Sequence, residues 1–115
     1  MVAATLLLLA SCSPSLEDAK VIELVRLNYK QQSTAPGAGR WMLDTVEIVS
    51  KDRLPGDTAR FKVIVYTRGL FRFPKIEDTP DGFMEKFRDT LQFEVENWGK
   101  IWKARRWMVI GSSHD

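Results

Sequence analysis

Histidine and cysteine are almost absent from the sequence. One residue of each occurs among the 115, so no intramolecular disulfide is available and no cysteine–histidine spacing for a zinc site exists. The single histidine, His114, is the penultimate residue, and we therefore do not expect a histidine-based acid–base pair inside a pocket. We expect a domain stabilised by packing alone, with no metal, no other cofactor and no catalytic residue.

A strong charge of either sign is also missing. The net charge is +2 with 28% charged residues, which is too small an excess to indicate nucleic-acid binding. Two carboxylate pairs are candidates for acid–base chemistry: Glu77 with Asp78, and Glu94 with Glu96. We interpret both as solvated, because the first lies in a predicted loop and the second on the polar face of a predicted strand.

A membrane-spanning run is missing as well. The N-terminal stretch from position 2 to position 10 is apolar and uncharged, but a transmembrane helix needs about 20 such residues. The only cysteine, Cys12, follows this stretch after Ser11, and Ser13-Pro14-Ser15 then interrupts any regular element. One interpretation of this stretch is an apolar strand, or the start of a helix, that buries Cys12. The other is a segment that is removed from the mature protein.

Leu9-Ala10-Ser11-Cys12 resembles the lipobox of bacterial lipoprotein precursors. The resemblance implies that a signal peptidase recognises Leu9, Ala10 and Ser11, that residues 1–11 are removed as a signal peptide, and that Cys12 then carries fatty acids such as palmitate. Residues 12–15 would form the lipid anchor and a short tether. Ser13 after the acylated cysteine implies the periplasmic face of the outer membrane rather than the inner membrane. One departure is that no Lys or Arg precedes the apolar run.

The segment from Ser15 to about Gln32 predicts an amphipathic helix. Ser15 is the expected N-cap, with Asp18 three residues later as in a variant capping box. Helical periodicity places apolar side chains on one face: Val21, Ile22, Leu24, Val25 and Tyr29. We expect this helix to cover a sheet. The small and polar residues 31–39 then predict a loop.

Beyond the loop the period of the pattern changes from helical to extended. We predict strands at residues 41–50, 58–73, 90–96 and 101–110, with a turn at 51–57 and a tight turn at 97–100. Gly69 is expected at a bulge or bend. Thr79-Pro80-Asp81 is expected to start a short helical turn carrying Phe83 and Phe87. The alternative is that the same residues extend the following strand backwards. The domain should therefore span residues 16–110, and residues 111–115 should form a disordered tail.

This order of elements, together with the hairpin at residues 93–103 and its Lys100–Lys103 segment, resembles the cystatin-like or NTF2-like roll. That resemblance implies an α+β fold with one N-terminal helix packed on a curved four-stranded antiparallel sheet. The fuller NTF2-like pattern has two or three helices before the sheet, and this chain has one. The resemblance therefore does not imply a deep enzymatic cone.

Two groups of residues are candidates for binding. A basic patch on the last hairpin contains Lys100, Lys103, Arg105 and Arg106 near Trp98, and cations beside aromatic rings suit a lipid headgroup or an acidic partner. The alternative is a solvated edge strand that blocks unwanted pairing. The second candidate is a ligand-binding hollow lined by Phe61, Phe93 and Trp102, and the alternative there is simply the core.

The leading functional hypothesis is a membrane-tethered, non-catalytic lipoprotein of the bacterial envelope that acts in protein interaction or assembly. Its expected partners are the membrane, through the lipid on Cys12, and an envelope protein. A small-ligand carrier or sensor is the second hypothesis. A hydrolase or isomerase of the NTF2-like type is third, because no interior histidine is present.

Overall fold

The computed structural model describes residues 15–34, 39–73 and 84–114, which form one helix and four strands. The elements are α2 (Asp18–Ser33), β1 (Arg40–Arg53), β2 (Arg60–Arg72), β3 (Met84–Trp98) and β4 (Ile101–His114). The strands make one antiparallel sheet in the order β1-β2-β3-β4, so each strand pairs with its neighbour along the chain. The predicted α+β architecture of one helix and four antiparallel strands is confirmed.

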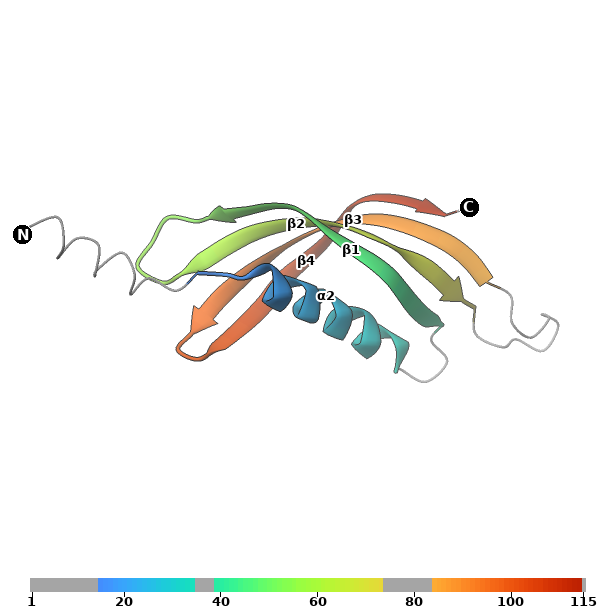
Figure 1. Ribbon diagram of the computed structural model, residues 1–115, viewed down its shortest axis with the longest axis horizontal. Helices are drawn as coiled ribbons and strands as arrows, with labels where there is room; N and C mark the ends of the chain where they lie inside the picture. Colours follow the sequence, from blue (N-terminus) through green and yellow to red (C-terminus); the bar gives the residue numbers. More distant parts are fainter. Residues whose placement is uncertain (1–14, 35–38, 74–83, 115) are drawn as a thin grey trace, which may run out of the picture.

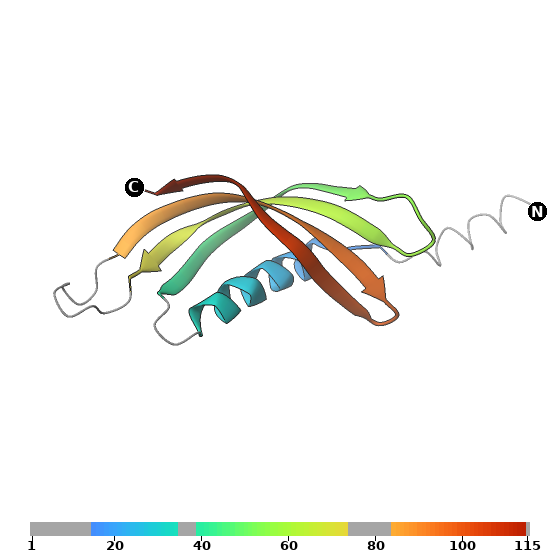
Figure 2. The same ribbon diagram turned by 180° about the vertical axis from the view of Figure 1, so that it is seen from behind.

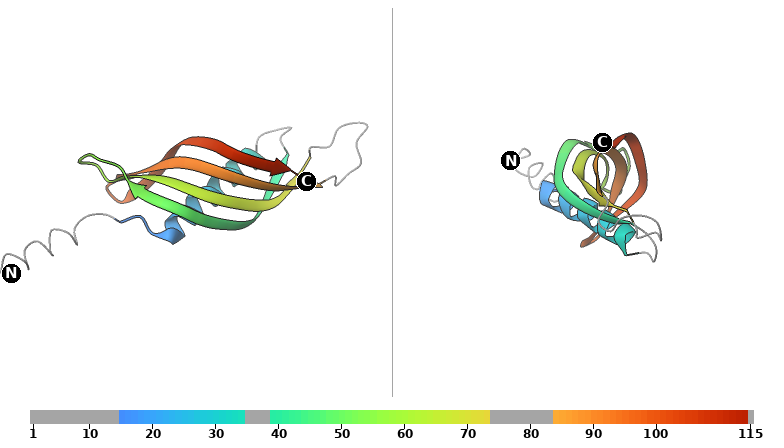
Figure 3. Two further views of the ribbon diagram at one scale, coloured as in Figure 1. Left: turned by 90° about the horizontal axis from the view of Figure 1, so that it is seen from above. Right: turned by 90° about the vertical axis from the view of Figure 1, so that its right-hand side faces the viewer.

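The sheet arches over the helix, and α2 lies under its concave side (Figure 1, Figure 2). We call the face toward α2 the inner face and the opposite one the outer face. Seen from above, the four strands lie side by side with β1 and β4 at the edges (Figure 3). Among the strands, α2 lies nearest to β1. The single helix therefore covers the sheet from the β1 side and leaves β4 less covered.

The core lies between α2 and the inner face. The predicted apolar face of the helix is confirmed, because Val21, Val25 and Tyr29 are buried, and Val63 and Val65 of β2 are buried against the same side. The other buried members of this cluster are Leu16, Phe87, Leu91, Phe93 and Val95. Alternation with a period of two places every second β3 side chain from Phe87 to Val95 on the inner face.

The start of α2 differs from the prediction. Glu17, not Ser15, is the N-cap residue, and it makes no side-chain capping hydrogen bond. Leu16 is buried and Val21 lies at the fourth helical position, an arrangement typical of a hydrophobic staple. The Lys51 ammonium on β1 donates to the Leu16 carbonyl oxygen at 2.8 Å. Burial of Leu16 and this contact with β1 fix the helix start, and a local cap does not.

The strands are longer than predicted. β4 continues to His114, so the disordered tail expected at residues 111–115 is wrong for residues 111–114. The pairs Thr90–Gly111, Asp89–Ser112 and Arg88–Ser113 extend the ladder between β3 and β4. β1 likewise continues to Arg53 into the predicted turn, because residues 51–53 pair with β2.

The predicted helical turn is wrong at Phe87, which is a fully buried residue of β3. Residue 87 belongs to the strand because Phe87 continues the alternation of buried side chains on the inner face. The remainder of that prediction, at Thr79-Pro80-Asp81 and Phe83, lies outside the described residues. So do the lipobox, Cys12, and the carboxylates of Glu77 and Asp78.

The bulge expected near Gly69 lies on the partner strand. The register between β1 and β2 shifts between Leu43 and Thr45, opposite Gly69 and Arg68. A side chain at Gly69 would overlap the carbonyl oxygen of Met42, so the close approach of β1 requires glycine. The predicted irregularity in the ladder is thus present beside Gly69, but the extra residue is Asp44 of β1.

Candidate binding surfaces

The tip of the β3–β4 hairpin exposes two large apolar side chains. Trp98 and Ile101 are direct cross-strand partners, with 56% and 60% of their surface exposed. The turn between them is Gly99-Lys100, and Gly99 adopts the left-handed conformation with φ 69°, as two-residue hairpin loops require. The Lys103 ammonium lies 5.1 Å from the centre of the Trp98 ring. Exposed apolar side chains and an ammonium group are thus combined at one end of the sheet.

The two arginines of the predicted basic patch are neutralised by glutamates. Arg106 Nη1 donates to Glu94 Oε2 at 2.7 Å, and Arg105 Nη2 forms an ion pair with Glu96 Oε2 at 2.8 Å. The two glutamate side chains are 17% and 13% exposed, so the prediction that they are solvated is wrong. Among the described residues, neither Lys100 nor Lys103 forms an ion pair. The four cations are therefore not equivalent, and the unpaired ones lie close to the tip.

The hairpin tip and the start of α2 lie at the same end of the molecule (Figure 1). Leu16 is held there by Lys51, near the end of β1. Within the described part of the chain, no helix combines the length and apolar character that crossing a bilayer requires. Any anchor that precedes Ser15 in the sequence would therefore join the folded domain at the end that carries Trp98 and Ile101.

The predicted ligand hollow on the inner face is filled by side chains. Phe93 is fully buried and stacks on Trp107 with ring centres 4.1 Å apart. Phe61 lies 6.0 Å from Trp102 between ring centres, and both rings pack against the core. Phe61, Phe93 and Trp102 are therefore core residues, as in the alternative interpretation.

An open groove of about 220 Å³ remains between α2 and β4. It is lined by Asn28 and Gln32 of the helix and by Trp107 and Val109 of the strand, among others. Next to it, Met108, Val109 and Ile110 are 53%, 58% and 48% exposed. Leu27 of α2 is also 48% exposed. The least covered part of the sheet thus presents apolar side chains.

A buried polar cluster on the inner face connects α2 with three neighbouring strands, β2, β3 and β4. The Tyr29 hydroxyl lies 2.7 Å from Thr67 Oγ1 and donates to Asp89 Oδ2 at 3.4 Å. Ser112 Oγ donates to Asp89 Oδ1 at 2.7 Å. Burial raises the pKa of the Tyr29 hydroxyl far above its ordinary value, and the nearby charge of Asp89 acts in the same direction. Tyr29 is therefore a neutral hydrogen-bonding group that ties the helix to the sheet.

The sequence alone did not reveal this cluster. Thr67 and Asp89 fall on the inner face by the same alternation as Val65 and Leu91. Extending that alternation toward the middle of β2 and β3 was the available signal. Their side chains are satisfied by partners at 22 to 60 residues' separation in the chain, which local reasoning cannot supply.

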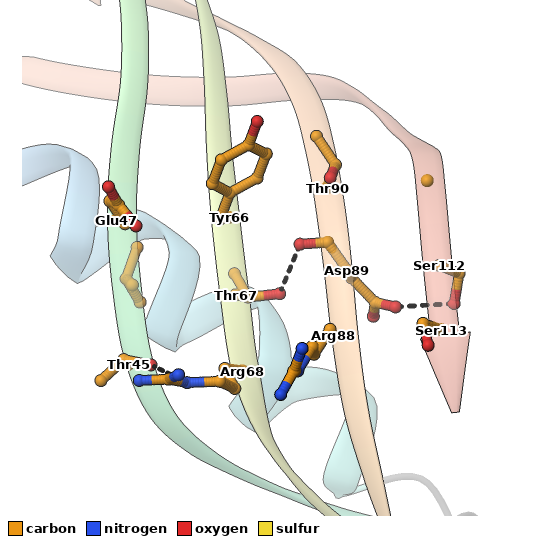
Figure 4. Close-up of a pocket in the computed structure, with 12 residues that line it drawn as sticks. Thr45, Glu47, Tyr66, Thr67, Arg68, Arg88, Asp89, Thr90, Ser112 and Ser113 are labelled. Carbon is orange, nitrogen blue, oxygen red and sulfur yellow. Dashed lines mark hydrogen bonds between the residues drawn. The ribbon is translucent and has the colours of Figure 1, made fainter. Parts of the chain in front are cut away.

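The outer face carries two hollows that adjoin at a pair of arginines. Arg68 and Arg88 are direct cross-strand partners and line both hollows, which measure about 630 and 520 Å³. Figure 4 shows the larger one, where Arg68 Nε donates to Thr45 Oγ1 at 3.1 Å. Sequence patterning predicts that this face is solvent-directed, but it does not show which residues of neighbouring strands meet there.

The described residues contain no group of three or more His, Cys, Asp or Glu side chains that could hold a metal ion. No protein-family model, curated protein or solved structure matches this chain. Its function must therefore be inferred from the surfaces described above.

Proposed function

We propose that this chain is a membrane-tethered, non-catalytic lipoprotein of the bacterial envelope that binds a partner protein along β4. In this proposal Cys12 carries the lipid, and the domain is a small roll of the cystatin-like or NTF2-like kind. The observation that carries the proposal is the half-exposed apolar run of Met108, Val109 and Ile110 beside the groove along α2. Contiguous exposed apolar surface of this kind marks interaction sites in soluble domains.

The occupant that best fits this surface is an amphipathic helix of the partner. Two register shifts interrupt β4, one opposite Phe93 and one between Thr90 and Leu91. Such bulges hinder the addition of a further strand to an edge. A helix lying beside α2 would instead cover Val109, which pairs with the inner-face residue Leu91, and would complete the layer that one helix leaves unfinished. Packed helices lie about 8–10 Å apart, so a partner helix next to α2 would reach the inner side of β4.

The hairpin tip supports a membrane-proximal orientation. Residues 13–15 lie between Cys12 and Leu16, and at ~3.5 Å per extended residue they reach only about 10 Å. Trp and Lys side chains suit the headgroup boundary, and each lysine near an anionic surface contributes about 1 kcal/mol. With Trp98, Ile101, Lys100 and Lys103 toward the membrane, the groove beside β4 remains open to the periplasm. We place the protein at the periplasmic face of the outer membrane.

Partner binding is tested with two matched valine variants. Val109 of β4 is 58% exposed, and Val49 of the opposite edge strand, β1, is 47% exposed. Val109→Arg and Val49→Arg add the same charge at an exposed valine, but only the first lies at the groove. We expect cross-linking in intact cells to yield a discrete partner adduct with the parent and with Val49→Arg, and to lose it with Val109→Arg. The same adducts in all three proteins would refute binding along β4.

Lipid attachment is tested separately at Cys12. Cys12→Ala should leave an uncleaved precursor and abolish labelling by a fatty-acid analogue, because the chain has no other thiol. Labelling that survives the substitution would rule out this anchor. Fractionation should place the parent in the outer membrane, and recovery only from the inner membrane would contradict the proposed location.

A further inference from the structure

The arginine pair on the outer face is unfavourable for the fold by itself. Arg68 and Arg88 lie directly opposite each other on neighbouring strands, and like charges in that position destabilise a sheet. Among the described residues, neither arginine forms an ion pair with a carboxylate. The contrast with the other end of the same face is clear, because Arg105 and Arg106 there each pair with a glutamate. Two cations that face each other without a carboxylate partner indicate a role outside folding.

A hydrogen bond orients the Arg68 guanidinium over the outer face. Thr45 accepts a hydrogen bond from Arg68 Nε, which fixes the plane of that guanidinium. In Figure 4 the Arg68 side chain extends from β2 toward Thr45 on β1, and the Arg88 side chain leans from β3 toward β2. The two cations therefore lie on one side of the sheet at directly paired positions, and arginine binds an anionic group through two parallel hydrogen bonds.

The two hollows that meet at the pair differ in chemistry. The larger one has hydroxyl groups from Thr45, Tyr66, Thr90 and Ser113 along its wall. In the smaller one, Met42 and Leu70 supply apolar surface. A ligand with a polar anionic part and an apolar part would thus find a matching half-site on each side of the arginines.

The surrounding charge favours an anion. Lys86 lines the smaller hollow, and Arg40 and Arg72 form a second cross-strand pair of cations on the same face. Glu47 and Asp89 line the larger hollow, and Asp44 lines the smaller one. The five cations outnumber these three carboxylates, so the net charge around the arginine pair favours an anion.

We propose that Arg68 and Arg88 form a binding site for a phosphate monoester that carries an apolar group. The phosphate is held by the two guanidinium groups and the neighbouring hydroxyls, and the apolar group lies against Met42 and Leu70. Phosphatidic acid, whose headgroup is a phosphate monoester, and a soluble alkyl phosphate share this chemistry. The site lies on the opposite face from the groove along β4, so it does not depend on the proposed partner binding.

Binding is measured by calorimetry on the full chain with three soluble probes: hexyl phosphate, inorganic phosphate and hexanol. We expect hexyl phosphate to bind at least tenfold more tightly than either of the other two, because only it uses both half-sites. Arg68→Gln and Arg88→Gln should each weaken its binding about tenfold or more, the scale expected for a charge-assisted hydrogen bond. Lys62→Gln is the matched control, because Lys62 lies on the same strand and the same face, opposite Glu94, and it should leave binding unchanged.

Unfolding by urea gives a second readout that a merely structural pair would not produce. Arg68→Gln and Arg88→Gln should be at least as stable as the parent, since each relieves the like-charge contact. No binding of hexyl phosphate by the parent, or equal binding by the parent and both arginine variants, would overturn the proposal. Equal affinity for inorganic phosphate would overturn the apolar half. Vesicles with and without phosphatidic acid then separate a lipid source, in which arginine-dependent binding is retained, from a soluble one.

Discussion

Phe93 stacks on Trp107 because Arg106 takes up an extra position in β4. Gln92 pairs with Met108 and Glu94 with Arg105, so two residues, Arg106 and Trp107, lie opposite the single Phe93. Arg106 adopts φ 58°, in the left-handed region. This bulge turns the Trp107 ring onto the inner face, where its stacking on Phe93 closes the core beside β4.

A non-glycine residue at position 106 should therefore lower the stability of the fold relative to glycine. A non-glycine residue in the left-handed region costs about 1–2 kcal/mol. We expect Arg106→Gly to unfold at higher urea than Arg106→Ala, with a difference of about 1 kcal/mol, because both variants lose the pair with Glu94. This order reverses the usual preference for alanine over glycine in regular structure. Equal stability of the two variants would show that the backbone here is not strained.

Gly69 should not tolerate a methyl group. A Cβ at this position would overlap the Met42 carbonyl oxygen and lie 3.0 Å from a ring carbon of Phe87. We expect Gly69→Ala to lower the free energy of unfolding by more than about 2 kcal/mol, because two backbones must separate. Gly111→Ala is the control, since a Cβ there meets Thr90 Oγ1 at 3.4 Å, an ordinary contact. Similar losses in both variants would contradict the close approach of β1 and β2.

The Tyr29 hydroxyl should stabilise the fold in a pH-dependent way. Tyr29→Phe should cost about 1–3 kcal/mol at neutral pH, because Thr67 and Asp89 lose a buried partner. Burial raises the pKa of Tyr29, so the unfolded chain releases this proton near pH 10 while the folded chain retains it. The stability of the parent should then fall above about pH 10 by up to ~1.4 kcal/mol per pH unit.

The control for this pH dependence is Tyr66→Phe. Tyr66 is 50% exposed on the outer face, so its removal should leave the alkaline loss of stability in place. Tyr29→Phe should remove much of that loss when urea unfolding is followed from pH 8 to 12. An identical alkaline profile for the parent and Tyr29→Phe would exclude Tyr29 as its source.

Membrane contact should depend on the hairpin tip more than on the paired arginines. In a chain starting at Ser13, which retains every core residue, Lys100→Gln with Lys103→Gln should weaken binding to anionic vesicles. Arg105→Gln with Arg106→Gln removes the same charge but also leaves Glu94 and Glu96 without their partners. We expect the double lysine variant to bind anionic vesicles more weakly than the parent at physiological salt. Trp98→Ala should weaken binding at both low and high salt, because salt does not screen an apolar contact.

Sedimentation with vesicles measures each of these effects. If all variants bind as the parent does, the tip is only a solvated hairpin, or it contacts a protein. If only the arginine variants lose binding, the assignment of the unpaired lysines is wrong.

The sequence by itself determined the helix face, the four strands and their inner alternation. Val21, Val25 and Tyr29 recur with a helical period, and Val63 and Val65 alternate with a period of two, so burial of one side follows from local geometry. These patterns need no knowledge of which strand lies beside which. They also sufficed to identify Phe61, Phe93 and Trp102 as inner residues, although not whether a hollow remained between them.

Only the tertiary structure decided which residues meet across strands. The pairing of Arg105 and Arg106 with glutamates, the opposition of Arg68 and Arg88, and the bulge at Arg106 all depend on register, which is set by hydrogen bonding between segments far apart in the chain. The continuation of β4 to His114 has the same origin, because residues 111–114 are strand only through their pairing with β3. Periodicity assigns a side chain to a face, and register then decides whether its neighbour is a partner or a like charge.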